Sequence, residues 1–139
     1  MEFILTLHSH LPYVLNHGRW PHGSDWLTEA AVDTYLPLLE TLRALEADDV
    51  PAPVTIGFTP VLANQLASPT FADELEAFLA QRLAACAEAP AALSAAGDGH
   101  LLPLVEWWRE RLVRLRELFR SIDRDLIAAF RELEDAGRL

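Results

Sequence analysis

Two histidines one residue apart, His8 and His10, stand where an apolar run that begins at Phe3 ends. A continuous apolar run is typical of a strand covered on both faces, and α/β proteins bind ligands beyond the carboxyl ends of such strands. If the strand continues through both histidines, their side chains point to the same face. The pair can then supply two imidazoles to a metal ion or hydrogen-bond the hydroxyls of a sugar. The plainer alternative leaves one imidazole bonded to backbone and the other in solvent.

Trp20 is a second candidate for ligand binding. It stands with Pro21 and Gly23 in a loop expected over residues 15–24. An exposed indole on such a loop offers a flat apolar face on which a pyranose ring can stack. The alternative is that Trp20 fastens the loop to the body of the protein.

The other tryptophans and the single cysteine are expected to be structural. Trp26 falls in the first turn of a predicted helix, where packing is the simpler explanation. Trp108 belongs to an apolar stripe of the last predicted helix and is expected in the core, whereas its neighbour Trp107 points in another direction. Cys86 stands between two alanines on a helix, which favours a small packed side chain.

The sequence holds no glycine-rich phosphate loop, nucleophile elbow, His-Glu-x-x-His or Cys-x-x-Cys. Every carboxylate falls on an expected helix, turn or terminus, and none ends a strand. This placement is unfavourable for a reaction that needs two facing carboxylates. The charged residues from Glu106 to Arg120 are spaced as on a solvated helix face.

Composition limits the class of protein. The 139 residues fit one domain, and a hydrophobic share of 51% is enough for a sizeable core. The net charge of −10 argues against a nucleic acid or an anionic membrane as partner. A single cysteine excludes an intramolecular disulfide, and neither a signal peptide nor an apolar stretch of ~20 residues is visible. We therefore expect a soluble, cytoplasmic protein.

Apolar periodicity and turn residues predict the elements that position these candidates. Strands are expected over residues 2–8 and 54–58, with a short turn over 48–53 before the second strand. Helices are expected over residues 25–47, from Pro60 onward, over 70–88 and over 103–136, with a loop over 90–99.

Helix ends and joints can also be predicted. Ser24 and Thr59 are expected N-caps, and Thr70 forms a capping box with Asp73. Pro37 is expected to bend the first helix. Ser121 and Asp123 mark a joint in the last helix, and Gly137 suits its C-terminal end.

The order strand, helix, strand, helices follows βαβ logic and predicts an α/β fold with a parallel sheet. Two strands do not make a stable sheet with both faces covered. Since a third strand is due just after the last helix, the expected fold is an unfinished barrel.

The segment His8-Ser9-His10-Leu11-Pro12-Tyr13-Val14, followed by His17-Gly18-x-Trp20-Pro21-x-Gly23, resembles the N-terminus of family-57 glycoside hydrolases. Among these, it is most similar to the 1,4-α-glucan branching enzymes. The resemblance continues through Glu29-Ala30, residues 34–38 and residues 56–63, and more loosely down the last helix. It departs from the family pattern at Ser9, where alanine is usual, and at His22, where phenylalanine is common.

The resemblance implies the N-terminal portion of an incomplete (β/α)7 barrel, with residues 1–139 as one fragment of a catalytic domain and no second domain. It also implies a retaining reaction on α-glucan, in which a glutamate nucleophile forms a glycosyl-enzyme intermediate and an aspartate acts as acid and then base. The strands that carry those two residues are expected beyond Leu139, so no catalytic residue is assigned here and the isolated chain is expected to be inactive.

The same resemblance implies substrate binding by His8, His10 and Trp20. It implies no metal and no organic cofactor. The expected partners are α-glucan, in the complete enzyme, and the remaining C-terminal part of the barrel.

Two other functions fit parts of the sequence. Metal-dependent hydrolases also place a His-x-His pair at the end of their first strand, as zinc or manganese ligands, with further ligands on later strands. A noncatalytic interaction module complete at 139 residues would explain the lack of catalytic carboxylates but not the paired histidines.

Overall fold

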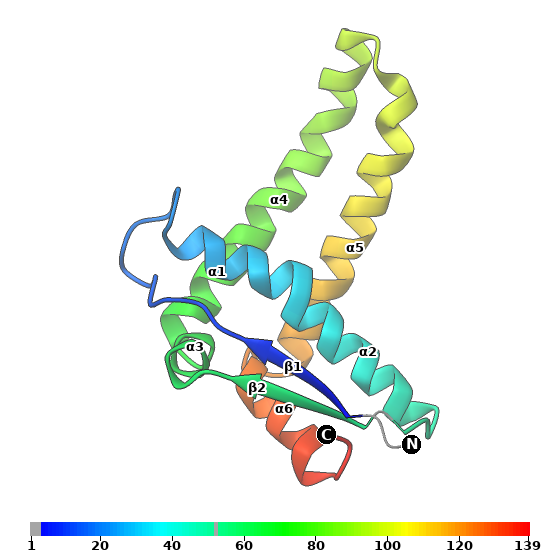
Figure 1. Ribbon diagram of the computed structural model, residues 1–139. Coiled ribbons are helices and arrows are strands. Elements are labelled where there is room, and N and C mark those ends of the chain that lie inside the picture. Colours follow the sequence, from blue (N-terminus) through cyan, green and yellow to red (C-terminus); the bar gives the residue numbers. More distant parts are fainter. Residues whose placement is uncertain (1–3, 52) are drawn as a thin grey trace.

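The computed structural model describes residues 4–51 and 53–139. Their elements, in chain order, are β1 (Leu5–Ser9), α1 (Ser24–Ala30), the π-helical η1 (Ala31–Tyr35), α2 (Leu36–Ala47), β2 (Val54–Phe58), α3 (Pro60–Leu66), α4 (Pro69–Ala96), the 3₁₀ turn η2 (Gly99–Leu101), α5 (Leu102–Ser121) and α6 (Leu126–Asp135) (Figure 1). Glu2 and Phe3, which open the first predicted strand, and Ala52, in the predicted turn before the second, lie outside the described residues.

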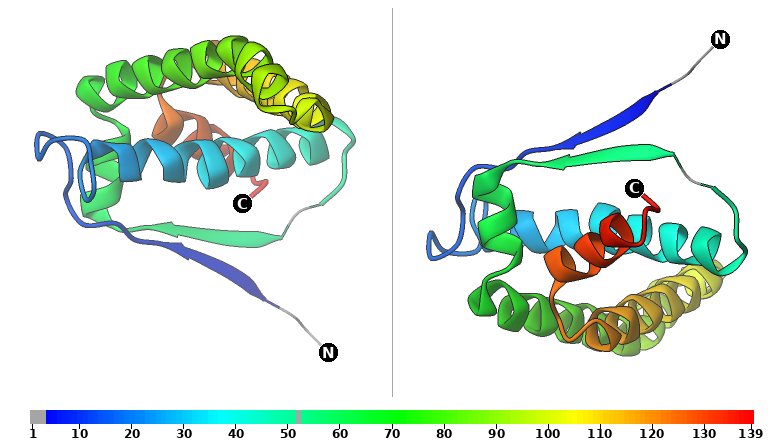
Figure 2. Two further views of the ribbon diagram at one scale, coloured as in Figure 1. Left: turned by 90° about the horizontal axis from the view of Figure 1, so that it is seen from above. Right: turned by 90° about the horizontal axis from the view of Figure 1, so that it is seen from below.

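The two strands form a parallel pair, as predicted, with Leu5 opposite Val54 and Ser9 opposite Phe58. The second strand has the predicted bounds, whereas the first continues one residue past His8. Helices cover one face of this sheet and leave the other uncovered (Figure 2). The expectation that both faces are covered is therefore wrong for the described residues. Leu5 and Leu7 share the helix-side face with their partners Val54 and Ile56, yet they are 44% and 36% exposed because β1 is an edge strand.

The register decides which side chains face the uncovered side. Val54, Ile56 and Phe58 pack against the hydrophobic core beneath the sheet. Side chains of a strand alternate between its faces, and paired residues of neighbouring strands share a face. His8 and its partner Gly57 therefore belong to the uncovered face.

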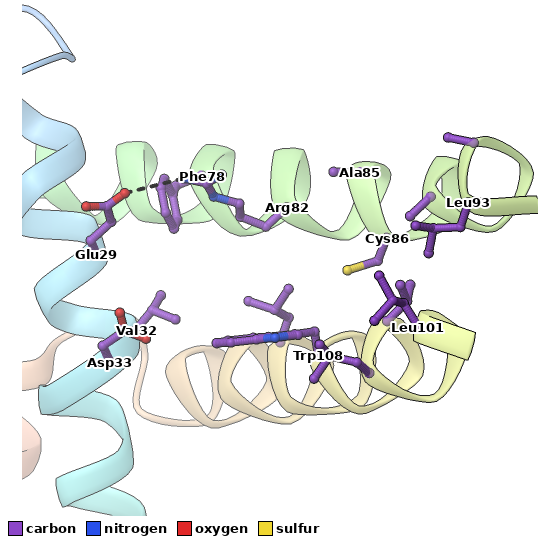
Figure 3. A pocket seen from close by; sticks show the side chains of 15 residues that line it. Glu29, Val32, Asp33, Phe78, Arg82, Ala85, Cys86, Leu93, Leu101 and Trp108 are labelled. Atoms are coloured by element: carbon purple, nitrogen blue, oxygen red, sulfur yellow. Dashed lines mark hydrogen bonds and ion pairs between the residues drawn. The ribbon is translucent and has the colours of Figure 1, made fainter. Parts of the chain in front are cut away.

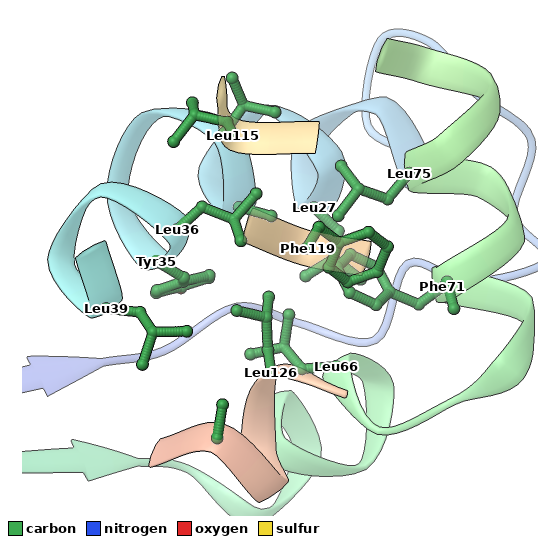
Figure 4. Packing of buried hydrophobic residues seen from close by; sticks show 14 of the residues in the cluster. Leu27, Tyr35, Leu36, Leu39, Leu66, Phe71, Leu75, Leu115, Phe119 and Leu126 are labelled. Atoms are coloured by element: carbon green, nitrogen blue, oxygen red, sulfur yellow. The ribbon is translucent and has the colours of Figure 1, made fainter. Parts of the chain in front are cut away.

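Beneath the sheet, α1 and α2 form one layer, and the hairpin of α4 and α5 lies beyond it (Figure 2). Figure 4 shows how the core joins these elements around Phe71 of α4 and Phe119 of α5, whose rings meet edge to face at 6.3 Å between centroids. Both phenylalanines are fully buried. Burial of these two rings stabilises the fold through the apolar area removed from water and through their edge-to-face contact.

The predicted helix over residues 25–47 is continuous but contains the π-helical segment η1. Pro37 explains it, because a proline has no N–H to donate to the carbonyl of Asp33 four residues earlier. The Leu36 N–H instead bonds the carbonyl of Ala31, five residues back. The expected bend at Pro37 thus takes the form of a wide turn. Ser24 is not the N-cap: Gly23 holds that position and Ser24 is the first helical residue.

Helix α4 is longer than predicted. It starts at Pro69, with Ser68 as its N-cap, so the proposed capping box of Thr70 and Asp73 is wrong. It also passes through Pro90 to Ala96, where a loop was expected. The alanines after Pro90 have the highest helix propensity and continue the helix until Gly97, which ends it in the left-handed conformation.

The predicted joint in the last helix is confirmed between α5 and α6. Asp123 and Arg124 both adopt positive φ angles, 53° and 63°, which break the helix. The Asp125 carboxylate then accepts a 2.9 Å hydrogen bond from the Ala128 N–H and caps α6. Gly137 follows α6 at φ 69°, as predicted for its C-terminal end.

No helix among residues 4–51 and 53–139 is long and apolar enough to cross a membrane.

Candidate functional site

His8 lies at the carboxyl end of β1, exposed on the uncovered face of the sheet. Its neighbour across the strands is Gly57, and a Cβ atom at that position would come within 3.6 Å of the His8 Nδ1 atom. The glycine therefore leaves open space beside the imidazole on the sheet surface. A sugar or another flat ligand can approach His8 from this side.

His10 follows one residue after β1 ends and is also exposed. The chain then turns away from the sheet at Pro12, as predicted for a residue that cannot donate to a strand ladder. Leu11, Val14 and Leu15 are buried in the core and anchor this segment to the body of the protein. His10 is thus an exposed side chain on an anchored backbone.

Gln65 of α3 also anchors this segment, through two hydrogen bonds, and sequence reasoning missed it. Its side chain is fully buried, and its Oε1 atom accepts a hydrogen bond of 2.7 Å from the Val14 N–H. Its Nε2 atom donates to the Pro12 carbonyl at 3.0 Å. The signal in the sequence was an amide at the position that completes the apolar face of a short helix with Leu62 and Leu66.

The loop that carries Trp20 closes on itself through backbone contacts. The Ser24 N–H donates to the Gly18 carbonyl at 2.9 Å, and the Asp25 N–H donates to the Arg19 carbonyl at 3.3 Å. Gly18 has a φ of 79°, which favours glycine. Trp20 lies at the tip of this closed loop and is 77% exposed, so the alternative that it latches the loop to the body is wrong.

Arg19 ties the same loop to two helices. Its Nε atom bonds the Asp25 carboxylate of α1 at 2.8 Å, and its Nη2 atom bonds the Gln81 side chain of α4 at 3.1 Å. These contacts fix the backbone next to Trp20 while leaving the indole in solvent.

Further aromatic side chains surround the loop. Tyr13 and His17 meet edge to face at 6.0 Å, and His22 lies 6.1 Å from Trp26 between ring centroids. Trp26 is 42% exposed, so the expectation that it is simply packed is wrong. The described contacts include none that joins His8, His10 and Trp20 directly. All three belong to β1 or to the segment that leaves its carboxyl end before α1.

Below this surface, buried Tyr35 packs edge to face on Phe58, the β2 partner of Ser9, at 5.6 Å between ring centroids. Burial raises the pKa of the Tyr35 phenol, and the nearby Ser9 side chain offsets part of that effect. Tyr35 therefore stays neutral and supports the end of the sheet through this ring contact.

The carboxylates are placed as the sequence predicts. In the described parts of the chain, each lies in a helix or in a connection between helices or before β2, and none lies in the strands or in residues 10–23. No group of three or more histidine, cysteine, aspartate or glutamate side chains among these residues is placed to hold a metal ion. The surface around His8 and His10 can therefore bind and orient a ligand, but it lacks paired acids.

A separate apolar groove of about 600 Å³ lies between the distal halves of α4 and α5 (Figure 3). Trp108 lines it and is 39% exposed, so the prediction that this residue belongs to the core is wrong. The reason is that α4 presents small side chains opposite the start of α5, Ala85, Cys86, Ala89 and Ala92, which are too short to close the space. Cys86 also lines the groove and is only partly buried.

No family model matches this chain. It is 32% identical to a 1,4-alpha-glucan branching enzyme of Thermococcus kodakarensis over 95% of its length, and 46% identical over 48% of its length to a probable 1,4-alpha-glucan branching enzyme of Mycobacterium tuberculosis.

Solved structures agree with this similarity. The GH57-type branching enzyme of Pyrococcus horikoshii superposes with a TM-score of 0.89 at 35% identity, over 97% of this chain and 25% of that chain. The Thermococcus kodakarensis GH57 branching enzyme, solved in complex with glucose, superposes with a TM-score of 0.86 at 32% identity, over 97% of this chain and 24% of that chain. The alpha-amylase AmyC of Thermotoga maritima, at 24% identity and a TM-score of 0.85, shares the fold.

The matched region is a small part of each relative. The chain spans 19% of the Thermococcus kodakarensis enzyme and 13% of the Mycobacterium tuberculosis protein. Its two parallel strands and their helices correspond to the N-terminal part of GH57 enzymes, whose barrel is (β/α)7.

Proposed function

We propose that this chain, a homologue of the N-terminal part of GH57 1,4-alpha-glucan branching enzymes, forms one wall of an α-glucan-binding cleft. On this proposal residues 1–139 belong to one catalytic domain. His8 and His10 hydrogen-bond glucose hydroxyls, and Trp20 stacks on a sugar ring. In the whole protein the bound glucan is transferred by a retaining reaction to a 6-hydroxyl of another chain.

The observation that carries the proposal is the pairing of two exposed imidazoles with an exposed indole at one strand end. His8 stands beside Gly57 on the uncovered sheet face, and Trp20 projects from a loop that leaves the same strand. Imidazoles supply directional hydrogen bonds and the indole supplies a flat apolar surface, which together suit the alternating polar and apolar surface of a sugar.

A retaining reaction also requires two carboxyl groups about 5–5.5 Å apart on either side of the scissile bond. The described residues place no carboxylate at the carboxyl ends of β1 and β2. Under the proposal, these acids come from other strands of the barrel, and this region contributes binding.

The described residues hold no group of three or more possible metal ligands, and a metal site would, like the acids, need residues from other strands. The homologues and the aromatic loop favour glucan over a metal-bound substrate. For these reasons we propose α-glucan as the one ligand class.

The test is a titration of the purified 139-residue chain with maltoheptaose, a linear α-1,4-glucan, followed by NMR. We expect the resonances of His8, His10 and the Trp20 indole to shift. Trp20→Ala should weaken binding about tenfold, the equivalent of about 1.4 kcal/mol. Trp107→Ala is the matched control, because Trp107 is a 52% exposed tryptophan on α5, away from the strand ends.

Equal losses in the two tryptophan variants would indicate indiscriminate stacking of sugar on exposed indoles and would contradict the proposal. A shift confined to Trp107 and Trp108 would move the glucan site to α5.

A further inference from the structure

Gln65 occupies a position where an apolar side chain would be expected. It lies on α3 between Leu62 and Leu66, and all three residues are buried. A buried amide is costly unless both its donor and its acceptor are satisfied. Gln65 meets this condition with two backbone partners more than fifty residues away in the sequence.

Those partners lie three and five residues beyond the end of β1, where no strand ladder satisfies the backbone. β1 ends at Ser9, and Val14 is buried, so its N–H has no access to water. A buried backbone N–H without a partner costs about 1–3 kcal/mol. Gln65 supplies the missing acceptor at 2.7 Å and also a donor for the Pro12 carbonyl at 3.0 Å.

Only an amide of this length makes both contacts. A glutamine offers an acceptor oxygen and a donor nitrogen on one planar group, whereas an ionised glutamate accepts only and a methionine does neither with useful strength. The two bonds therefore fix the distance and the orientation of residues 12–14 relative to α3.

Next to this fixed segment stands His10, two residues before Pro12, with the buried Leu11 between them. Two anchors hold the backbone on either side of His10. On one side, the Ser9 carbonyl accepts a 3.1 Å hydrogen bond from the Thr59 N–H, and on the other, the Pro12 carbonyl accepts one from Gln65. The backbone that carries the exposed imidazole is thus fixed on both sides.

We propose that Gln65 is a positioning residue that holds His10 and the start of the Trp20 loop in the orientation that binds glucan. The part of this statement that concerns glucan rests on the proposed function. The part that concerns His10 rests on the hydrogen bonds and burial of Gln65 and on the Thr59–Ser9 bond, and it needs no glucan.

The test compares Gln65→Met, which loses both bonds at similar volume, with Leu115→Val, a conservative change in the buried core of α5. Gln65→Glu is a third variant that keeps the acceptor for Val14 and loses the donor for Pro12. Each is measured at the same number of degrees below its own Tm, by hydrogen exchange of the Val14 amide, by the ring resonances of His10, and by maltoheptaose titration.

We expect Gln65→Met to speed exchange of the Val14 amide at least about tenfold, to shift the His10 ring resonances, and to weaken maltoheptaose binding at least about fivefold. Gln65→Glu should speed Val14 exchange less than Gln65→Met does, but it should still shift the His10 ring resonances. It serves as the test variant if Gln65→Met does not fold. Leu115→Val should leave all three readouts unchanged.

Unmoved His10 resonances in both Gln65 variants, or equal changes in Leu115→Val, overturn the positioning role. If the unmodified chain does not bind maltoheptaose, the proposed function fails, while the His10 resonances and the Val14 exchange still decide the role of Gln65.

Discussion

Gly23 faces the backbone of Gly18 so closely that a Cβ atom at position 23 would overlap the Gly18 carbonyl group. The same carbonyl oxygen accepts a 2.9 Å hydrogen bond from the Ser24 N–H. The loop that exposes Trp20 is therefore closed at its base by two glycines, and the first turn of α1 is part of that closure. A side chain at position 23 would have to open it.

We accordingly expect Gly23→Ala to destabilise the protein by about 2 kcal/mol or more, because the overlap is with backbone and cannot be relieved by a rotamer change. The indole resonance of Trp20 should shift as the loop opens. Urea unfolding and NMR measure the two effects. Gly99→Ala is the matched control: a Cβ atom there meets nothing within 4 Å, so a change within about 0.5 kcal/mol is expected. Equal destabilisation of both variants would contradict the close contact.

Pro90 inside α4 leads to a second prediction. It cannot donate to the Cys86 carbonyl four residues earlier, and a proline in a helix interior costs about 3 kcal/mol. Pro90→Ala should stabilise the protein by about 1–2 kcal/mol, since the gain is partly offset by a more flexible unfolded chain. Thermal unfolding measures this as a higher Tm. Pro69→Ala should bring no gain, because Pro69 stands in the first turn, where the N–H needs no partner.

Glu76 makes stability depend on pH. Hydrogen bonds from Arg120 and Arg116, at 2.8 and 3.0 Å, hold the pKa of the Glu76 carboxyl below its ordinary value of 4.5. Because the folded pKa is the lower one, the stabilisation is complete above pH 4.5 and is lost as the pH falls through the folded value. Glu76→Gln should therefore cost about 1 kcal/mol at neutral pH and converge with the unmodified protein in acid.

The control for that experiment is Glu106→Gln. The Glu106 carboxyl also has a lowered pKa, caused by Arg109, but both side chains are about half exposed and screened by water. We expect the free energy of unfolding of Glu106→Gln to depend on pH in the same way as that of the unmodified protein. A profile for Glu76→Gln that stays parallel to that of the unmodified protein down to strong acid would show that the Glu76 contacts do not contribute.

The fourth prediction concerns turnover. Since the described residues supply no carboxylate pair at the strand ends, the 139-residue chain should neither hydrolyse nor branch amylose. Reducing-end release and the formation of 1,6 linkages are the measurements. Turnover that copurifies with the chain to homogeneity would refute this expectation. Glucan binding without turnover is consistent with it.

Much of the fold could be predicted from local sequence. Val54–Phe58 matches its predicted strand because an apolar run between turn residues leaves few alternatives, and the α5–α6 joint is visible in the sequence around Asp123. The errors arise where two local signals compete or where packing between elements decides exposure. Pro90 does not end α4, because the alanines after it keep the helix, and Trp108 remains half exposed because its neighbours across the groove are too short to cover it.

The candidate site was only partly visible in the sequence. His8 and His10 were found because histidine pairs after an apolar run are rare, and the strand end explains their exposure. Gln65 was missed because its two partners lie more than fifty residues away, and no pattern in a single helix indicates such a contact. Gly23 could be predicted only as a loop residue. Its close contact with the Gly18 backbone exists only in the closed loop, which no local pattern indicates.

The π-helical turn at Ala31–Tyr35 has a geometric consequence for the helix layer. Buried residues recur at steps of four along it, at Leu27, Ala31, Tyr35 and Leu39. In a regular α-helix each step of four overshoots a full turn by about 40°, so three steps would rotate the last residue about 120° away from the first. One extra residue accommodated in a wide turn removes about 100° of that rotation. The stripe therefore runs straight, and a single helix can lie flat against the sheet-side core from its first turn to its last.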